Sequence, residues 1–425
     1  MKLLVIGSGG REHAIVRALK KSPKANEIHV LPGNGGISED AVCAPIAATD
    51  IDGAVAYAKE HGMDFAVVTP DDPLCLGMVD AMEAAGIPCF GPDRRAAEIE
   101  GSKVFAKGLM KKYGIPTAAY EVFDNAEEAL KYVESAPAPI VVKADGLALG
   151  KGVVVAMTRE EAAAAVKNAM LDRAFGESGA RVVIEEYLEG PEMSVLSFTD
   201  GSTLVPMVAS MDHKRALDGD EGPNTGGMGA IAPNPYYTPE VAAECMEKIF
   251  LPTVRAMNAE GRPFRGCLYF GLMLTKDGPK VIEYNCRFGD PETQVVLPLL
   301  ETDIMDIIEA VWEEKLDTLD IKWSDKSCAC VVMASGGYPE KYETGKVISG
   351  LDENGQCEGA FVYHAGTKLE DGKFLTAGGR VLGITAYGDT LKEALDTAYK
   401  AVDTISFEKA HYRHDIGKKA LSALK

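Results

Sequence analysis

The sequence predicts a multidomain protein in which an α/β region is followed by α+β regions. Residues 1 to about 100 alternate short apolar strands with helical patterns, which is typical of a parallel sheet with helices on both faces. From about residue 138 onward the sequence is strand-rich, with glycine-rich connections. The chain has 425 residues, too many for one core, because domains usually contain roughly 100–200 residues.

The α/β region is predicted to contain three strands and three helices. We expect strands at residues 2–6, 28–31 and 65–69, and helices at residues 11–20, 51–61 and 74–85. Ser102 is a residue type that caps helix N-termini, so another helix is predicted from there to about residue 113, before Gly114 and Pro116.

The remaining chain is predicted to form three further parts. A compact α+β module is expected from strands at 140–144, 153–156 and 181–187 and an alanine-rich helix that begins at Arg159. Residues 193–294 are strand-rich but contain a long polar loop at 212–235, and a loop of this length is usually functional or disordered. A last α+β block covers about 327–425.

Composition limits the classes of partner. With 44 basic and 64 acidic residues, the net charge of −20 argues against nucleic acid, whereas small anions can still be held by lysines, Mg²⁺ and backbone amides. We expect no membrane partner, because no apolar run approaches the ~18 residues of a spanning helix. The nine cysteines are scattered without CxxC spacing, which favours free thiols and a cytoplasmic location.

The most informative stretch is the end of an apolar strand near residue 284. Because side chains alternate along a strand, Glu283, Asn285 and Arg287 are predicted to share one face, with Ile282 and Tyr284 on the other. A carboxylate and an amide oxygen suit Mg²⁺ that is also held by phosphate oxygens, and an arginine can stabilise a transferring phosphoryl group. The alternative is a structural Arg–Glu ion pair.

Two glycine turns follow the first two predicted strands. The turn at 7–12 (GSGGRE) opens a helix and favours a sugar-phosphate site, with a plain tight turn as the alternative. A dinucleotide site is disfavoured, because Glu12 replaces the usual Gly or Ala and no acidic residue ends the second strand. The second turn, at 33–36 (GNGG), lies at the same sheet edge.

Three further polar segments are candidates for ligand contacts. The connection at 143–152 (KADGLALGKG) is not a Walker A loop, but a glycine hairpin with Lys151 can close over a triphosphate; a solvated hairpin is the alternative. The acidic segment at 185–192 is either an adenine slot at an interdomain hinge or a linker. Arg380 lies in a turn that is either structural or part of a phosphate clamp.

Four collinear motifs give a family resemblance. They are GSGGREH at 7–13, KADGL at 143–147, PNTGGMG at 223–229 and RFGDPETQ at 287–294. With these motifs the chain resembles the ATP-grasp superfamily and, within it, the phosphoribosylamine–glycine ligase family. The resemblance implies ligation of glycine to 5-phosphoribosylamine with ATP, through glycyl phosphate, in de novo purine synthesis. The alternatives are another ATP-grasp carboxylate–amine ligase or carboxylase, and a dinucleotide-binding oxidoreductase.

The resemblance also implies an ATP-grasp fold with five parts. These are an N-terminal Rossmann-like domain (1–101), a helical connection (102–137), a lid subdomain (138–190), a central subdomain (191–325) and a C-terminal α+β domain (326–425). We expect a cytoplasmic monomer, with a dimer as the alternative.

The residues implied for each role fall into four groups. ATP would contact Lys103, Lys143, Gly150, Lys151, Gly152, Glu185, Glu186, Leu188 and Glu192. The other substrates would contact Gly9, Gly10, Arg11, Asn224, Gly226, Gly227, Gly289 and Asp290. The expected catalytic residues are Arg287, Lys143 and Asp212. Glu283 and Asn285 would hold Mg²⁺ or Mn²⁺; the number of ions stays open, because the preceding strand, at 267–274, carries no carboxylate.

Overall fold

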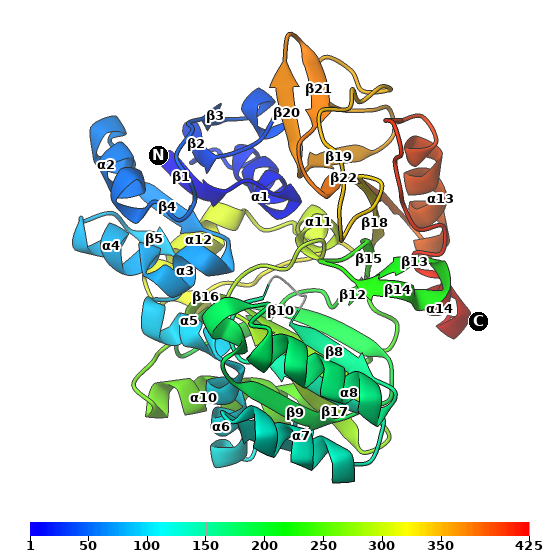
Figure 1. Cartoon of the computed structure of the whole chain (residues 1–425). Coiled ribbons are helices and arrows are strands. Elements are labelled where there is room, and N and C mark those ends of the chain that lie inside the picture. The colour runs from blue at the N-terminus through cyan, green and yellow to red at the C-terminus, as the bar shows by residue number, and fades with distance from the viewer. Residues whose placement is uncertain (149–151, 425) are drawn as a thin grey trace.

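A five-stranded parallel sheet forms the N-terminal part of the computed structural model, which describes residues 1–148 and 152–424 (Figure 1). Its strand order is β3-β2-β1-β4-β5. The strands are β1 (Lys2–Gly7), β2 (Glu27–Pro32), β3 (Val42–Cys43), β4 (Phe65–Val68) and β5 (Cys89–Phe90). The helical segments around it are α1 (Gly10–Lys20), η1 (Ile37–Glu39), α2 (Ile51–His61), α3 (Asp71–Leu76), α4 (Met78–Ala84) and α5 (Arg94–Gly101).

Residues of β1 pack alternately into two cores. Leu3 and Val5 lie in one core, and Leu4 and Ile6 lie in the other. The predicted parallel sheet with two covered faces is therefore confirmed. The single helix expected at 74–85 is wrong: Gly77 adopts a φ of 98°, a left-handed conformation that suits glycine, and separates α3 from α4.

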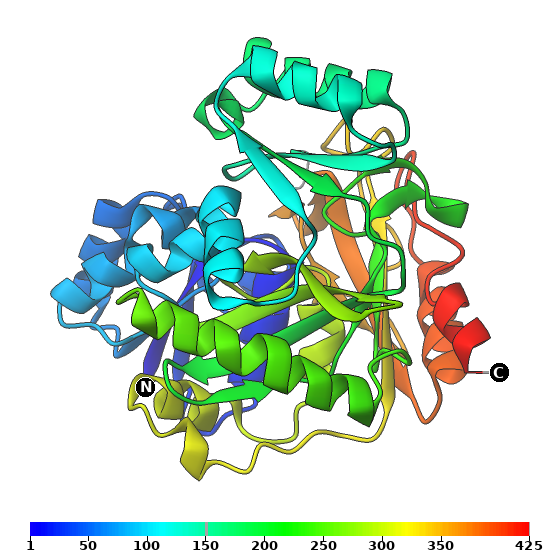
Figure 2. The ribbon, with the colours of Figure 1, turned by 90° about the horizontal axis from the view of Figure 1, so that it is seen from below.

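The small sheet is antiparallel, with the order β6-β9-β7-β8. Its strands are β6 (Tyr120–Phe123), β7 (Ile140–Ala144), β8 (Val153–Ala156) and β9 (Val182–Glu186). The helical segments beside it are α7 (Ala126–Ser135), α8 (Arg159–Val166), η2 (Lys167–Leu171) and η3 (Gly176–Gly179), whereas α6 (Lys103–Tyr113), which precedes β6, packs in the core that the N-terminal and central sheets share. The small sheet, α7 and α8 share a core of their own and stand apart from the other sheets in Figure 2. Ser102 caps α6 as predicted, accepting a hydrogen bond from the Phe105 amide.

The central sheet is antiparallel, with the order β11-β10-β16-β17. Its strands are β10 (Glu192–Asp200), β11 (Leu204–Pro206), β16 (Arg265–Thr275) and β17 (Gly278–Asn285). The helical segments that accompany it are α9 (Pro239–Cys245), η5 (Met246–Phe250), α10 (Leu251–Ala259), α11 (Thr293–Val296), η6 (Leu297–Leu299), α12 (Ile304–Trp312) and η7 (Leu316–Thr318). Both cores of the N-terminal sheet continue into this sheet, so the two sheets pack as one body.

The C-terminal sheet has the order β12-β15-β18-β22-β19. Its strands are β12 (Met211–Asp212), β15 (Gly229–Ala232), β18 (Ser327–Ala334), β19 (Phe361–His364) and β22 (Arg380–Gly388). The remaining elements are two hairpins and three helical segments: β13 (Arg215–Leu217) with β14 (Glu221–Asn224), β20 (Thr367–Glu370) with β21 (Lys373–Thr376), η4 (Asp218–Asp220), α13 (Leu391–Val402) and α14 (Lys418–Ala423).

The long loop expected at 212–235 is wrong in part, because it contains strands. β13 and β14 form a hairpin, and β15 pairs with β18 in the C-terminal sheet. Likewise, β6 and α7 lie in the stretch expected as a helical connection and belong to the small sheet's module. The five domain boundaries given above stay predictions. No helix in the described part of the chain is long and apolar enough to cross a bilayer.

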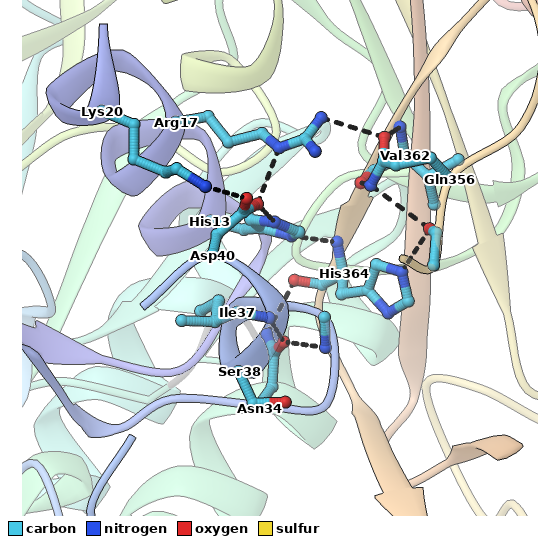
Figure 3. A network of polar contacts seen from close by, with 12 residues as sticks. His13, Arg17, Lys20, Asn34, Ile37, Ser38, Asp40, Gln356, Val362 and His364 are labelled. Carbon is cyan, nitrogen blue, oxygen red and sulfur yellow. Dashed lines mark hydrogen bonds and ion pairs between the residues drawn. The ribbon is translucent and has the colours of Figure 1, made fainter. Parts of the chain in front are cut away.

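A polar network joins the N-terminal and C-terminal regions (Figure 3). Asp40 accepts hydrogen bonds from Arg17 (2.8 Å) and contacts His13 Nε2 (3.0 Å). Arg17 also donates to Gln356 (2.9 Å), and the His364 amide donates to His13 Nδ1 (2.8 Å). Burial lowers the pKa of His13, so the neutral ring serves both as donor to Asp40 and as acceptor from His364.

Candidate active site

A cavity of about 1080 Å³ lies where the small, central and C-terminal sheets meet the N-terminal region. Most of the expected site residues line it: Arg11, Lys103, Lys143, Gly152, Glu185, Glu186, Leu188, Glu192, Asp212, Asn224, Gly226, Glu283, Asn285, Arg287 and Asp290. Four expected glycines do not line it: Gly9, Gly10, Gly227 and Gly289. Gly150 and Lys151 fall outside the described residues.

Two lysines meet one buried carboxylate at the small-sheet end of the cavity. Glu185, on β9, lies 3.1 Å from both Lys107 Nζ and Lys143 Nζ. Lys143 also donates to the Ile282 carbonyl (2.9 Å), and Lys107 donates to Thr117 (2.8 Å). Burial lowers the pKa of Lys107 to about 8. Glu185 thus holds one lysine from β7 and one from α6 at the same carboxylate.

Lys103 is fixed at the start of α6. Its Nζ donates to the Gly146 carbonyl (3.0 Å), in the loop after β7. Asp145 accepts from Ser102 (2.9 Å) and from the Val104 amide (2.8 Å), which holds that loop on the helix N-terminus. Lys103 and Lys107 are four residues apart on α6 and therefore face the same side. This face carries positive charge into the cavity.

Glu283 lies at the centre of a group of cations. Lys214 Nζ is 3.5 Å from Glu283 and 3.4 Å from Glu192. Burial alone would raise the pKa of Glu283, but Lys214 and then Lys143 and Lys103 lower it to about 2. Glu283 is therefore an ionised oxygen donor at neutral pH.

The strand that carries Glu283 departs from strict alternation. A register shift interrupts β16–β17 pairing, so that Leu272 faces Val281 while Gly271 faces Glu283. Val281 consequently packs in a core, and Ile282 lines the cavity beside Glu283. The prediction that Ile282 and Tyr284 face away from the cavity is wrong, because both line it; the bulge leaves Ile282 as the extra residue. Asn285 lines the cavity as predicted.

Arg287 pairs with a carboxylate that the sequence motif does not contain. Its Nη2 lies 3.0 Å from Glu100, on α5, and donates to Asn285 Oδ1 (3.2 Å). Arg287 Nε is buried and has no hydrogen-bond partner among the described residues. The structural alternative of an Arg287–Glu283 pair is therefore wrong, and Arg287 forms its ion pair with Glu100 instead.

The pair Glu283 and Asn285 fits a divalent cation by its chemistry. One ionised carboxylate and one amide oxygen are hard ligands of the kind that Mg²⁺ takes together with phosphate oxygens. Within residues 1–148 and 152–424, no group of three or more His, Cys, Asp or Glu side chains could hold a metal by itself. Any ion here would depend on ligand oxygens to complete its coordination.

A second pair of carboxyls, Asp212 and Glu292, also lines the cavity, and Lys214 acts on Asp212 as it does on Glu283. Asp212 ends β12, and burial followed by the nearby Glu292 raises its pKa well above the usual range, against the effect of Lys214. Glu292 is itself buried and accepts a hydrogen bond from Ser194 (3.3 Å). Burial and Glu292 thus disfavour the ionised form of Asp212, and a cationic group placed beside it would favour ionisation.

Arg380 connects two cavity loops from the C-terminal sheet. Its Nη1 donates to the carbonyls of Gly226 and Asp290, both at 2.8 Å. Its Nη2 lies 3.3 Å from the Asp290 carboxylate. The Gly226 amide in turn donates to the Tyr338 hydroxyl (3.0 Å). Of the two alternatives for Arg380, these contacts favour a structural role over a phosphate clamp.

The first glycine turn is packed by its own helix. Gly9 N donates to Glu12 (2.5 Å), which also accepts from Thr69 (2.7 Å) and Arg11 (2.5 Å). The Arg11 amide bonds to Asp290, so that carboxylate lies at the N-terminus of α1. Glu12 therefore fills the place where a dinucleotide fold needs a small residue.

The second glycine turn makes protein contacts. Gly33 N donates to the Gly7 carbonyl, Gly35 N to the Thr367 carbonyl and Gly36 N to Asn34 Oδ1. Asn34 Nδ2 donates to the His364 carbonyl (2.8 Å), as Figure 3 shows. These three glycine amides are thus engaged within the protein and do not form a phosphate site.

Several cavity residues were not predicted from the sequence. They are Glu100, Lys107, Lys214 and Glu292. Lys107 could have been predicted from the sequence, because it lies about one helical turn after Lys103. Lys214 and Glu292 lie inside motifs that were recognised, two residues after Asp212 and Asp290 respectively. Glu100 had no local signal, since its partner Arg287 is distant in sequence.

Comparison with known families matches almost the whole chain. Three regions match the family described as phosphoribosylglycinamide synthetase: its N domain at residues 1–100, its ATP-grasp (A) domain at 101–293 and its C domain at 328–419. The chain is 50% identical over 416 residues to phosphoribosylamine–glycine ligase of Caldanaerobacter subterraneus, covering 98% of this chain and 99% of that protein. It is 50% identical over 422 residues to the ligase of Halalkalibacterium halodurans, covering 99% and 98%.

Solved structures give the same grouping. The crystal structure of phosphoribosylamine–glycine ligase from Thermotoga maritima is similar with a TM-score of 0.86 and 34% identity, covering 98% of this chain and 100% of that one. A biotin carboxylase domain from Hydrogenobacter thermophilus, crystallised with MgADP, has a TM-score of 0.73 at 16% identity over 97% and 91%, which shows a shared fold alone. The chain therefore belongs to the phosphoribosylamine–glycine ligase family and has the ATP-grasp fold.

Proposed function

We propose that this chain joins glycine to 5-phosphoribosylamine at the expense of ATP, giving glycinamide ribonucleotide, ADP and phosphate, a step of de novo purine synthesis. The observation that carries this proposal is the cavity itself. It places the lysines around Glu185 and the ionised Glu283 at one end, and the carboxyls Asp212 and Glu292 at the other. The full-length match to ligases of this family supports it.

The nucleotide would lie between the small sheet and the central sheet. Lys103 and Lys143 would contact its phosphates, since both ammonium groups line the cavity near Glu283. The segment that ends β9, with Glu186 and Leu188, would line the adenine, and Glu192 would meet the ribose. The hairpin residues Gly150 and Lys151 are proposed phosphate contacts from the sequence alone, with Gly152 beside them.

The reaction needs no covalent enzyme intermediate. A glycine carboxylate oxygen attacks the γ-phosphorus of ATP, the bond to ADP breaks, and glycyl phosphate forms. The amine of phosphoribosylamine then attacks the carbonyl carbon, phosphate leaves, and the amine loses a proton. The protein contributes positioning and charge stabilisation, and positioning alone supplies roughly 7–11 kcal/mol in favourable cases. Arg287, which lines the cavity, would stabilise the transferring group through its guanidinium charge.

Glu283 and Asn285 would hold Mg²⁺ or Mn²⁺, which offsets negative charge on the nucleotide phosphates. Their place on β17 keeps both oxygens on the cavity side of the strand end. Lys214 contacts both Glu283 and Glu192, so its ammonium group offsets part of their negative charge.

The acceptor end would hold the two amine-bearing substrates. Asp212 would orient the glycine ammonium group, which would restore its ionised form. The loops with Asn224, Gly226 and Gly227 and with Gly289 and Asp290 would surround the reacting atoms. Arg11 would contact the ribose 5-phosphate, with Gly9 and Gly10 shaping its turn. We further propose a cytoplasmic monomer without nucleic-acid or membrane partners.

The direct test is ADP release by the purified chain, with phosphoribosylamine generated in place. Release should require glycine and phosphoribosylamine together and should match glycinamide ribonucleotide one to one. Release that depends on bicarbonate, or that needs another carboxylic acid instead of glycine, would replace this proposal with a different ATP-grasp enzyme. Binding of NADH without any ADP release would favour the oxidoreductase alternative.

A further inference from the structure

Two loops that carry family motifs face each other across the acceptor end of the cavity. One contains Gly226 and Gly227, between β14 and β15, and the other contains Asp290, after β17. Gly226 and Asp290 both line the cavity. Their mutual position determines how far apart two substrates bound to them would lie.

A single side chain from a third region bridges these loops. Arg380 Nη1 donates to the Gly226 carbonyl and the Asp290 carbonyl, both at 2.8 Å. Its Nη2 lies 3.3 Å from the Asp290 carboxylate, and the side chain is only 21% exposed. The planar guanidinium matches this set of acceptors, whereas a lysine ammonium has neither the reach nor the fixed fork.

The loop that Arg380 holds is in contact with Asp212. A Cβ added at Gly227 would lie 2.7 Å from Asp212 Oδ1 and 2.4 Å from Pro291, so the backbone is pressed against both. A Cβ at Gly226 would lie 3.0 Å from the Arg380 guanidinium carbon. A shift of the loop at Gly226 would therefore move the surroundings of Asp212 and of the Asp290 segment together.

Arg380 lies in the well-paired part of the C-terminal sheet. It begins β22, which pairs with β18 along eight residue pairs. The C-terminal sheet is fixed to the N-terminal region by the network around Asp40 and Asn34 (Figure 3). The Tyr338 hydroxyl adds a second contact from the same region to the Gly226 amide.

We propose that Arg380 is a positioning residue that sets the distance between the two amine-bearing substrates. It would act by fixing the loops at Gly226 and Asp290 relative to each other, so that the amine of phosphoribosylamine reaches glycyl phosphate before water does. This inference rests on the proposed function. It assigns to the C-terminal region a role in coupling ATP use to product formation, separate from binding the nucleotide.

The test is the coupling ratio, the ADP released per glycinamide ribonucleotide formed, measured with both products quantified in the same reaction. Arg380→Lys should raise this ratio to roughly two or more, because glycyl phosphate is then lost to water. The Kd of ADP, measured by calorimetry, should stay within about twofold of the wild type, since the nucleotide end is untouched. Tyr338→Phe should raise the ratio less.

A matched control is Arg17→Lys, which weakens an arginine contact between the same two regions but touches neither loop. Its coupling ratio should equal that of the wild type. If Arg380→Lys keeps a ratio of one, with both products falling equally, Arg380 is merely structural and the inference is wrong. If the wild type itself shows no glycine-dependent ADP release, the proposed function fails instead.

Discussion

Two carboxyl groups in the cavity, Glu283 and Asp212, have pKa values shifted in opposite directions. At the nucleotide end, Lys214, Lys143 and Lys103 surround Glu283 and lower its pKa to about 2, so the carboxylate is fixed as an anion. Beside Glu292, burial and the neighbouring carboxylate raise the pKa of Asp212, so its ionised form is disfavoured unless a cation lies next to it. The neighbours of a carboxyl, rather than its type, decide whether it suits a permanent cation or an arriving amine.

The largest effect is expected from removing the fixed anion. Glu283→Gln keeps the size of the side chain but loses its charge, and turnover should fall roughly 100-fold or more because a charged oxygen at the phosphates is lost. Steady-state ADP release measures this, with Glu189→Gln, an exposed glutamate outside the cavity lining, as the control. Near-normal turnover would remove Glu283 from the site.

The next largest effect is expected from replacing the Arg287 guanidinium. Arg287→Lys should lower turnover roughly tenfold or more while changing the Kd of ADP much less, because a point charge replaces a planar fork in the transition state. Glu100→Gln tests the same arrangement from the other side, since Glu100 holds Arg287 at 3.0 Å. An equal loss of ADP affinity and turnover in Arg287→Lys would contradict a role in phosphoryl transfer.

A smaller and more selective effect is expected at the acceptor end. Asp212→Asn should raise the KM for glycine roughly tenfold and leave the KM for ATP unchanged, because the amide cannot ionise beside an ammonium group. The measurement is ADP release at varied glycine and then at varied ATP. A rise in the KM for ATP alone would show that the two ends of the cavity are not separate.

The smallest effect concerns stability at low pH. Burial lowers the pKa of His213 to about 4 and that of His364 to about 3, from an ordinary value of 6.5. Below pH 6.5 the unfolded chain therefore binds more protons than the folded chain, and the free energy of unfolding falls as the pH drops toward 4. Urea unfolding from pH 7.5 to 5 should show this fall, and His213→Gln should make it shallower; a constant free energy would contradict the prediction.

The sequence predicted best what depends on local patterns. The parallel sheet, the Ser102 cap and the cavity-facing pair Glu283 and Asn285 follow from periodicity and capping, which act over a few residues. The bulge that turns Ile282 into the cavity could not be predicted, because it depends on pairing between β16 and β17. The break at Gly77 was missed because glycine within a helical pattern does not by itself show a left-handed conformation.

Long-range pairs were the main omission. Glu185 was expected near adenine and lines the cavity, but its two lysine partners come from α6 and β7 and meet it only in the folded chain. Arg287 was recognised, yet its partner Glu100 lies far earlier in the chain. Strands β12 and β15 were missed because runs of two and four residues carry little periodic signal.

The different roles given to Glu283 and Asp212 require the nucleotide and its metal to bind beside Glu283. A crystal structure of the chain with ADP and Mg²⁺ tests this most directly. We expect the ADP phosphates beside Lys103 and Lys143, and the ion in contact with both Glu283 and Asn285. Nucleotide bound at the Asp212 end, or an ion that contacts neither Glu283 nor Asn285, would contradict the account.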